Sequence, residues 1–135
     1  HRDGLGAYMV FEGRSDHGDA AILNAQIWLA KHFSVANPIE EVIRRSALAE
    51  RTFNRRFSNA TGHAPLAYVQ QLRVADAKRR LERTDEAVEE IGWRVGYEDP
   101  AFFRRLFKRL TGMTPGHYRR QLQIPAYAVA GQPSR

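Results

Sequence analysis

The chain has 135 residues, of which 43% are hydrophobic, and its formal net charge is +6, from 21 Lys and Arg against 15 Asp and Glu. These values exclude wholesale disorder and suit one compact domain or two very small ones, with nucleic acid favoured over a membrane surface as a polyanionic partner. Cysteine is absent, which excludes a disulfide framework, a thiolate metal site and a cysteine nucleophile.

Residues 1–18 contain four glycines and no sustained hydrophobic period. We interpret them as a linker or tail. They include no apolar stretch typical of a secretory signal, and the chain has no apolar run long enough for a transmembrane helix.

Helical periodicity begins near residue 20 and continues to about Phe33. Pro38, preceded by Asn37 as the expected N-cap, predicts the start of a second, short helix. After a break at residues 46–49, a third helix follows and ends at Gly62, since glycine readily takes the left-handed conformation that closes a helix.

A long helix is expected to open at Pro65 and to end near Thr84. The pair Thr84–Asp85 is expected to cap the short helix that follows. Asp99 as N-cap and Pro100 at the first helical position predict the next helix.

The last helix is predicted to begin at Thr114–Pro115 and to end near Leu122, and residues 123–135 are interpreted as a flexible tail. No run shows the alternation of a strand. The predicted fold is therefore all-α, with about seven helices.

The chain contains an internal repeat. Seven residues recur fifty positions later: Phe53, Arg55, Phe57, Thr61, Gly62, Pro65 and Tyr68 correspond to Phe103, Arg105, Phe107, Thr111, Gly112, Pro115 and Tyr118. Further upstream the offset is forty-nine, so that Ala47 corresponds to Gly96. Each repeat is a short helix, a turn and a second helix, which predicts helix-turn-helix subdomains at about 39–62 and 87–112, joined by the long helix.

In a helix-turn-helix the first helix braces the second, and the second lies in the DNA major groove. The paired phenylalanines would hold each second helix to the core, so the other faces point outward. The outward residues are Arg51, Asn54, Arg55 and Ser58 in the first repeat, and Ala101, Arg104, Arg105 and Lys108 in the second. Arginine can donate two hydrogen bonds to guanine, and asparagine can pair with adenine.

The long helix would separate the DNA-contacting second helices of the two repeats. About 17 residues at roughly 1.5 Å each span on the order of 25 Å. When the width of the packed helices is added, the distance between the two DNA-contacting helices comes near the ~34 Å of one DNA turn. We therefore expect one chain to occupy two successive major grooves, and to bend the DNA if the spacing falls short of a full turn.

Three stretches of the chain resemble the AraC/XylS-type DNA-binding domain. They are IWL…HF at 27–33, ERTFNRRFSNATGHAPLAYVQQLRVADAKRRLERT at 50–84 and IGWRVGYEDPAFFRRLFKRLTGMTPGHYRR at 91–120. The resemblance covers about residues 21–122, and the predicted domain spans 19–122. RSDHGDAAILNAQIWL and GYEDPAFFRR resemble the GlxA-type subgroup, whose N-terminal domain is DJ-1/PfpI-like. The resemblance implies that residues 1–18 are the linker leading from such a domain, which is missing here. The family implies a homeodomain-like bacterial transcription regulator in the cytoplasm, associated with the nucleoid, with double-stranded operator DNA as partner.

The resemblance also implies roles for individual residues. Base reading is expected from Arg51, Asn54 and Arg55 in the first repeat and from Ala101, Arg104 and Arg105 in the second. Thr52 and Lys108 are expected to contact phosphates, which position the protein without specifying sequence.

The sequence departs from the family pattern at three positions. Ala47 replaces the usual Gly of the first turn, and Ala49 replaces the usual Ser that caps the recognition helix, an expected loss of about 0.5–2 kcal/mol. Gly92 replaces the usual Ala of the second bracing helix, at an expected cost of ~1 kcal/mol.

Other readings stay open at this point. The chain could be a non-specific architectural binder of nucleic acid, or a helical protein-interaction module that docks on RNA polymerase. The dispersed histidines show no metal-ligand spacing, and Ser15–Asp16–His17 lies on a segment that cannot hold a catalytic triad. We expect no enzyme activity, cofactor or metal, a monomeric fragment, and a full-length protein that could dimerise.

Overall fold

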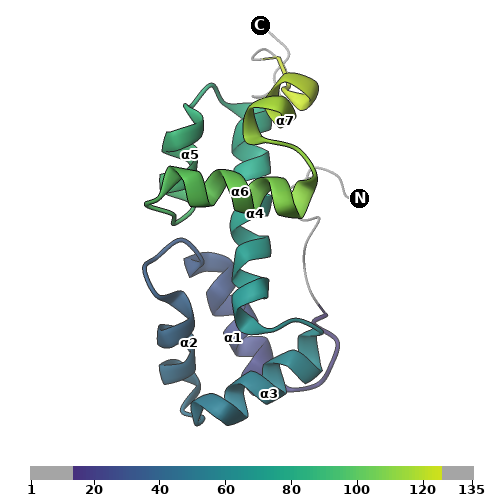
Figure 1. Ribbon diagram of the computed structural model, residues 1–135. Helices are drawn as coiled ribbons and strands as arrows, with labels where there is room; N and C mark the ends of the chain where they lie inside the picture. The colour runs from purple at the N-terminus through teal and green to yellow at the C-terminus, as the bar shows by residue number, and fades with distance from the viewer. Residues whose placement is uncertain (1–13, 126–135) are drawn as a thin grey trace, which may run out of the picture. The chain divides into compact units, whose positions relative to one another are not determined.

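The computed structural model describes residues 14–125. This part of the chain forms seven α-helices and no strand (Figure 1). They are α1 (Ala20–His32), α2 (Pro38–Ser46), α3 (Glu50–Thr61), α4 (Pro65–Arg83), α5 (Val88–Arg94), α6 (Pro100–Thr111) and α7 (Pro115–Leu122). The all-α prediction is confirmed, and none of these helices is long and apolar enough to cross a membrane.

The described residues divide into two compact units, one ending at Arg73 and the other beginning at Val74. We call them the first and second units. The boundary lies within α4, whose first half therefore belongs to the first unit and whose second half belongs to the second. Each unit contains one bracing helix and one recognition helix of the predicted repeat.

The core of the first unit is built around Phe53 and Phe57 of α3, which are both fully buried. Their rings stack with centroids 5.4 Å apart, and the ring of Tyr68 meets Phe57 edge-on at 5.0 Å. α1, α2 and α3 pack on one another around these rings, with Ile22 and Leu29 of α1 also at zero exposure. The four-residue spacing of the phenylalanines thus fixes which face of α3 is inside.

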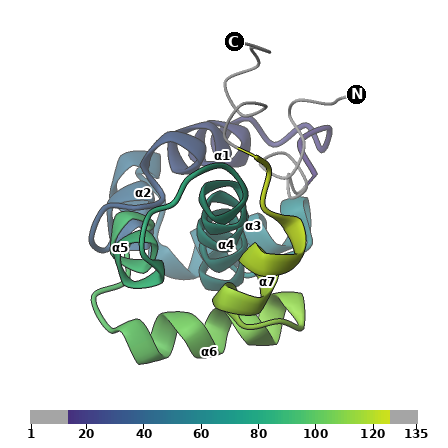
Figure 2. The same cartoon turned by 90° about the horizontal axis from the view of Figure 1, so that it is seen from above.

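The core of the second unit repeats this arrangement with Phe103 and Phe107 of α6. Tyr118 of α7 meets Phe107 edge-on, with centroids 5.5 Å apart, as Tyr68 meets Phe57. Figure 2 shows α5 and α7 lying beside α6. Ile91 of α5 is fully buried in the same cluster.

Three of the described helices have a side-chain cap at their N-terminus. The side chain of Asp19 accepts a hydrogen bond from the Ile22 amide, Asp99 caps α6, and Thr114 caps α7 through the amide of His117. Gly62 and Gly112 close α3 and α6 in the left-handed conformation, with φ of +83° and +85°.

Two expected caps were wrong. Asn37 precedes α2 but has left-handed backbone angles and makes no side-chain cap, although its carbonyl accepts from the Glu41 amide at 3.3 Å. The pair Thr84–Asp85 does not cap α5, because that helix begins only at Val88. The Thr84 hydroxyl, just beyond the end of α4, instead donates to the Arg80 carbonyl at 2.8 Å.

The segment before α1 is bound to the first unit. His17 Nε2 lies 2.8 Å from Gln26 Oε1, and Gln26 Nε2 donates to the Arg14 carbonyl at 2.9 Å and to the Tyr68 hydroxyl at 3.0 Å. Residues 1–13 and 126–135, which carry most of the predicted linker and tail, lie outside the described residues. The predicted division at 18 and 122 therefore stays a prediction.

Candidate nucleic-acid interface

The two turns between bracing and recognition helices each contain a residue with positive φ. Ala47 has φ +62° and Gly96 has φ +116°. These are the residues that the forty-nine-residue offset aligns, so the alignment of the turns predicted from the sequence is confirmed. The conformation is unfavourable for alanine, because its Cβ crowds the following carbonyl in the left-handed region.

The predicted site residues of α3 lie on its outer face. Arg51 and Arg55 are exposed, and Thr52 and Asn54 are half-buried. This is the face opposite the two buried phenylalanines. The arrangement can present two guanidinium groups and one amide to a ligand along α3.

Arg56 has a different role. Its Nε and Nη2 atoms donate to the two carboxylate oxygens of Asp19, at 3.1 and 2.8 Å, in a bidentate pair. The hydrogen bonds from Arg56, with a smaller contribution from the Ile22 amide, hold the pKa of Asp19 below its ordinary value. This pair ties the recognition helix to the start of α1.

The predicted site residues of α6 are all exposed: Ala101, Arg104, Arg105 and Lys108. Asp99 accepts hydrogen bonds from the Ala101 and Phe102 amides and so fixes the first turn that carries this row. Arg104 is the one member of the row with an acidic partner among the described residues, since its Nη2 donates to Glu89 of α5.

Most of these cations have no acidic partner among the described residues. Within residues 14–125, no ion pair holds Arg51, Arg55, Arg105 or Lys108. In contrast, Arg45 pairs with Glu41 and Arg94 pairs with Glu86. α3 and α6 therefore each expose cations without an acidic partner in this part of the chain, and such cations can act on a polyanion.

Two exposed residues of α6 were missed in the sequence. Arg109 is exposed and follows Arg105 by one helical turn, a spacing that could have identified it. Phe102 is 38% exposed, with its ring 5.3 Å from that of Tyr97. A phenylalanine beside two buried ones gives no sequence signal of exposure.

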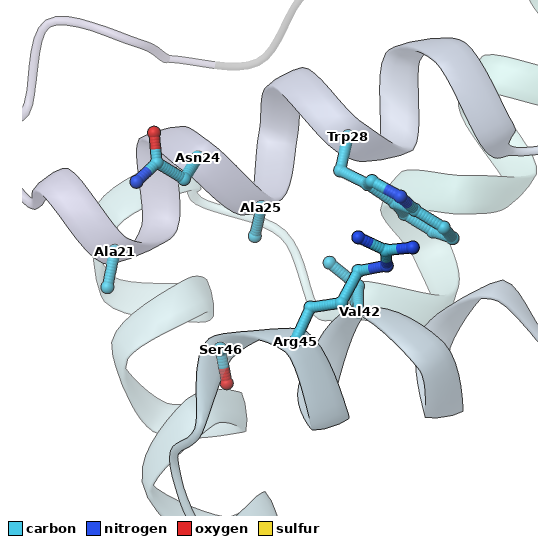
Figure 3. A pocket seen from close by; sticks show the side chains of 7 residues that line it. All are labelled: Ala21, Asn24, Ala25, Trp28, Val42, Arg45 and Ser46. Carbon is cyan, nitrogen blue, oxygen red and sulfur yellow. The ribbon is translucent and has the colours of Figure 1, made fainter.

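A hollow of about 190 Å³ lies between α1 and α2 in the first unit (Figure 3). Ala21, Ala25 and Val42 contribute apolar surface to it, and the Arg45 guanidinium lies 5.1 Å from the Trp28 ring. No residue of α3 lines it, and its arginine is already paired with Glu41. We treat it as a packing feature apart from the recognition helices.

The sequence profile of a family described as a helix-turn-helix domain matches residues 42–121, which is more than half of the chain. The chain belongs to the AraC family of helix-turn-helix DNA-binding domains. The matched range contains both recognition helices of this AraC-type domain and the α4 helix between them.

Relatives of this AraC-type domain are known as transcription regulators. The transcriptional activator RhaS of Escherichia fergusonii is 33% identical over 110 residues, which cover 82% of this chain and 39% of RhaS. A helix-turn-helix transcriptional regulator of Mycobacterium tuberculosis is 39% identical over 85 residues, which cover 63% of this chain and 33% of the regulator. The chain therefore spans less than half the length of these relatives.

Solved structures show the same fold. The DNA-binding domain of the global transcriptional factor AdpA, solved in complex with a target DNA, is 33% identical with a TM-score of 0.71, over 85% of this chain and 98% of that one. The C-terminal domain of AraT, a response regulator from Geobacillus stearothermophilus, is 26% identical with a TM-score of 0.78, over 84% of this chain and 94% of that one.

Proposed function

We propose that this chain binds double-stranded DNA at specific sequences, as the DNA-binding part of a bacterial transcription regulator. The observation that carries the proposal is the repeated outer face: α3 and α6 are each held by two buried phenylalanines and expose cations without an acidic partner. The AdpA domain in its DNA complex, at 33% identity, supports the same ligand class for this chain.

Base reading is assigned to Arg51, Asn54 and Arg55 on α3, and to Ala101, Arg104 and Arg105 on α6. The arginines suit guanine, the asparagine suits adenine, and the methyl group of Ala101 suits the thymine methyl. Each good bidentate contact contributes about 1–3 kcal/mol of discrimination. Each recognition helix is proposed to enter its own major groove, in two successive grooves of one site.

Phosphate contacts are assigned to Thr52 and Lys108. They contribute affinity without sequence preference, and this part of the affinity falls as salt rises because phosphate neutralisation releases counterions. The logarithm of the binding constant should fall by roughly 0.9 per neutralised phosphate for each log unit of salt.

Arg105 and Lys108 make a matched pair of tests on the same helix. Against a duplex selected by the wild-type chain from a random pool, Arg105→Ala should cost ~1–3 kcal/mol and relax preference at one position. Lys108→Ala should weaken all duplexes alike and reduce the salt slope. Equal weakening of every duplex by Arg105→Ala would remove Arg105 from the base-reading set, and an unchanged slope would remove Lys108 from the phosphate set.

The alternatives are outcomes of the same binding experiment. A non-specific architectural binder would bind the selected and the random duplex equally at physiological salt. A protein-interaction module, docking for instance on RNA polymerase, would bind duplexes no better than a basic control protein.

Because this chain covers only part of the length of its relatives, the properties of the whole protein are inferred separately. We infer a monomeric DNA-binding fragment, whose full-length protein gains dimerisation and effector sensing from a DJ-1/PfpI-like domain of the GlxA type. The support is the resemblance of RSDHGDAAILNAQIWL and GYEDPAFFRR to that subgroup. Sequencing the gene upstream of the codon for residue 1 tests the subgroup: a DJ-1/PfpI-like domain encoded there in frame would support it, and its absence would overturn it.

A further inference from the structure

We propose that Glu89 of α5 is a positioning residue that orients Arg104 for base reading and so contributes to the sequence preference of the second unit. The inference rests on the proposed function, since it assigns a cause to the selectivity of Arg104. It concerns a residue of the bracing helix, which is not itself among the proposed DNA contacts.

The contact joins the two helices of the second helix-turn-helix. Arg104 Nη2 donates to Glu89 Oε2, fifteen residues away in the chain. Both side chains are at the surface, with 45% and 57% exposure, so the pair lies where a ligand of α6 would approach. Arg105, the next residue, has no such partner within the described residues.

The backbone packing of α5 on α6 makes this contact reachable. Gly92 is buried, and a Cβ at that position would lie 2.8 Å from Cδ2 of Phe103. The missing side chain lets the two helices approach closely at this point. Glu89 lies one helical turn before Gly92, and Arg104 directly follows Phe103, so the close approach brings their side chains together.

Arginine carries five N–H donors in a planar fork, and Glu89 engages one nitrogen of the group. The Nε and Nη1 donors have no partner among the described residues. A free arginine loses rotamer freedom when it binds a base, whereas one already held by a carboxylate loses less. The carboxylate also opposes phosphate approach. Glu89 should therefore lower general affinity and raise discrimination.

The first unit provides an internal comparison. By the repeat offsets, Glu40 occupies the place of Glu89, and Asn54 occupies the place of Arg104. Since Asn54 is uncharged, this unit has no equivalent ion pair at that place. The orienting role is therefore specific to the second recognition helix.

The test is a double-mutant cycle in the intact chain with Glu89→Gln, Arg104→Ala and the double variant. The probes are the duplex selected by the wild-type chain, its single-base variants and a random duplex. Arg104→Ala first identifies the base position whose preference depends on Arg104. Glu90→Gln is the matched control, because Glu90 is adjacent on α5 but pairs with Arg94 of the same helix. Circular dichroism and thermal melting confirm that each variant is folded.

We expect Glu89→Gln to reduce preference at the Arg104-dependent position by about threefold or more, in the range of coupling between contacting residues. It should also tighten binding to random duplex, and at the Arg104-dependent position the double variant should show the same base preference as Arg104→Ala. An unchanged preference profile, a loss at some other position, or additive effects in the double variant would each overturn the role of Glu89. If the wild-type chain selects no sequence, the proposed function fails instead.

Discussion

Gly92 gives the sharpest test of how α5 packs on α6. The sequence alone suggests that alanine would be better here, because alanine favours a helix interior over glycine by about 1 kcal/mol. The structure reverses this expectation. We predict that Gly92→Ala destabilises the chain.

The magnitude follows from the distances around an added Cβ. That atom would lie 2.8, 3.0 and 3.3 Å from Cδ2, Cγ and Cβ of Phe103. Phe103 is fully buried and cannot swing away. Overpacking of this kind costs about 1–3 kcal/mol, so after the helix-propensity gain we expect a net loss of about 1 kcal/mol. In a chain of this size that lowers the Tm by roughly 4 °C.

Gly116→Ala is the matched control. Gly116 also lies in a helix, α7, but a Cβ there would meet only the Nη1 atom of Arg120, at 3.5 Å. This variant should be neutral or stabilised by up to about 1 kcal/mol. Thermal and urea unfolding of both variants measure the difference. If Gly92→Ala raises the Tm as much as Gly116→Ala, the close α5–α6 packing is wrong, and so is the geometry on which the role of Glu89 depends.

Three further predictions concern the first unit. Ala47→Gly should stabilise the chain by about 0.5–1 kcal/mol, because Ala47 has φ +62° and glycine enters that region without a Cβ clash; an unchanged urea midpoint would contradict the strained turn. Ala49→Ser should raise the free energy of unfolding by about 0.5–2 kcal/mol, because α3 has no side-chain cap at Ala49 and a serine hydroxyl can accept from the free amides of the first turn of α3. An unchanged Tm would show that the serine does not form that cap. Asp19 contributes stability above about pH 4 that is lost as the pH falls, because the hydrogen bonds from Arg56 lower its pKa in the folded state. Asp19→Asn should therefore lower the Tm at neutral pH and make the Tm less dependent on pH in acid. An equal drop of the Tm at every pH would assign Asp19 to capping alone.

Much of the fold could be predicted from local sequence because local chemistry determines it. The spacing of Phe53 and Phe57 marks a buried helical face, and Gly62 marks a helix end, without knowledge of the rest of the chain. The repeat reinforced both, since two copies of one pattern rarely coincide by chance. The positive φ at Ala47 was predictable in the same way, by alignment with Gly96.

Contacts between distant residues could not be predicted in this way. Arg56 belongs to the same arginine-rich stretch as Arg55, yet it faces α1 and binds Asp19, thirty-seven residues earlier. Nothing in the stretch itself separates the two arginines, because their difference depends on where α1 packs. Gly92 was interpreted as a weakness of its helix for the same reason: its neighbour Phe103 is set by tertiary packing.

The central claim is that α3 and α6 read sequence with their outward cations. Selection of bound duplexes from a random pool, followed by competition of the selected duplex against random duplex at physiological salt, tests it most directly. We predict a selected site with two conserved blocks about one helical turn apart, and a preference for it of about a thousandfold or more over random duplex. Equal binding of the two duplexes, or a site with no recurring block, would contradict the claim.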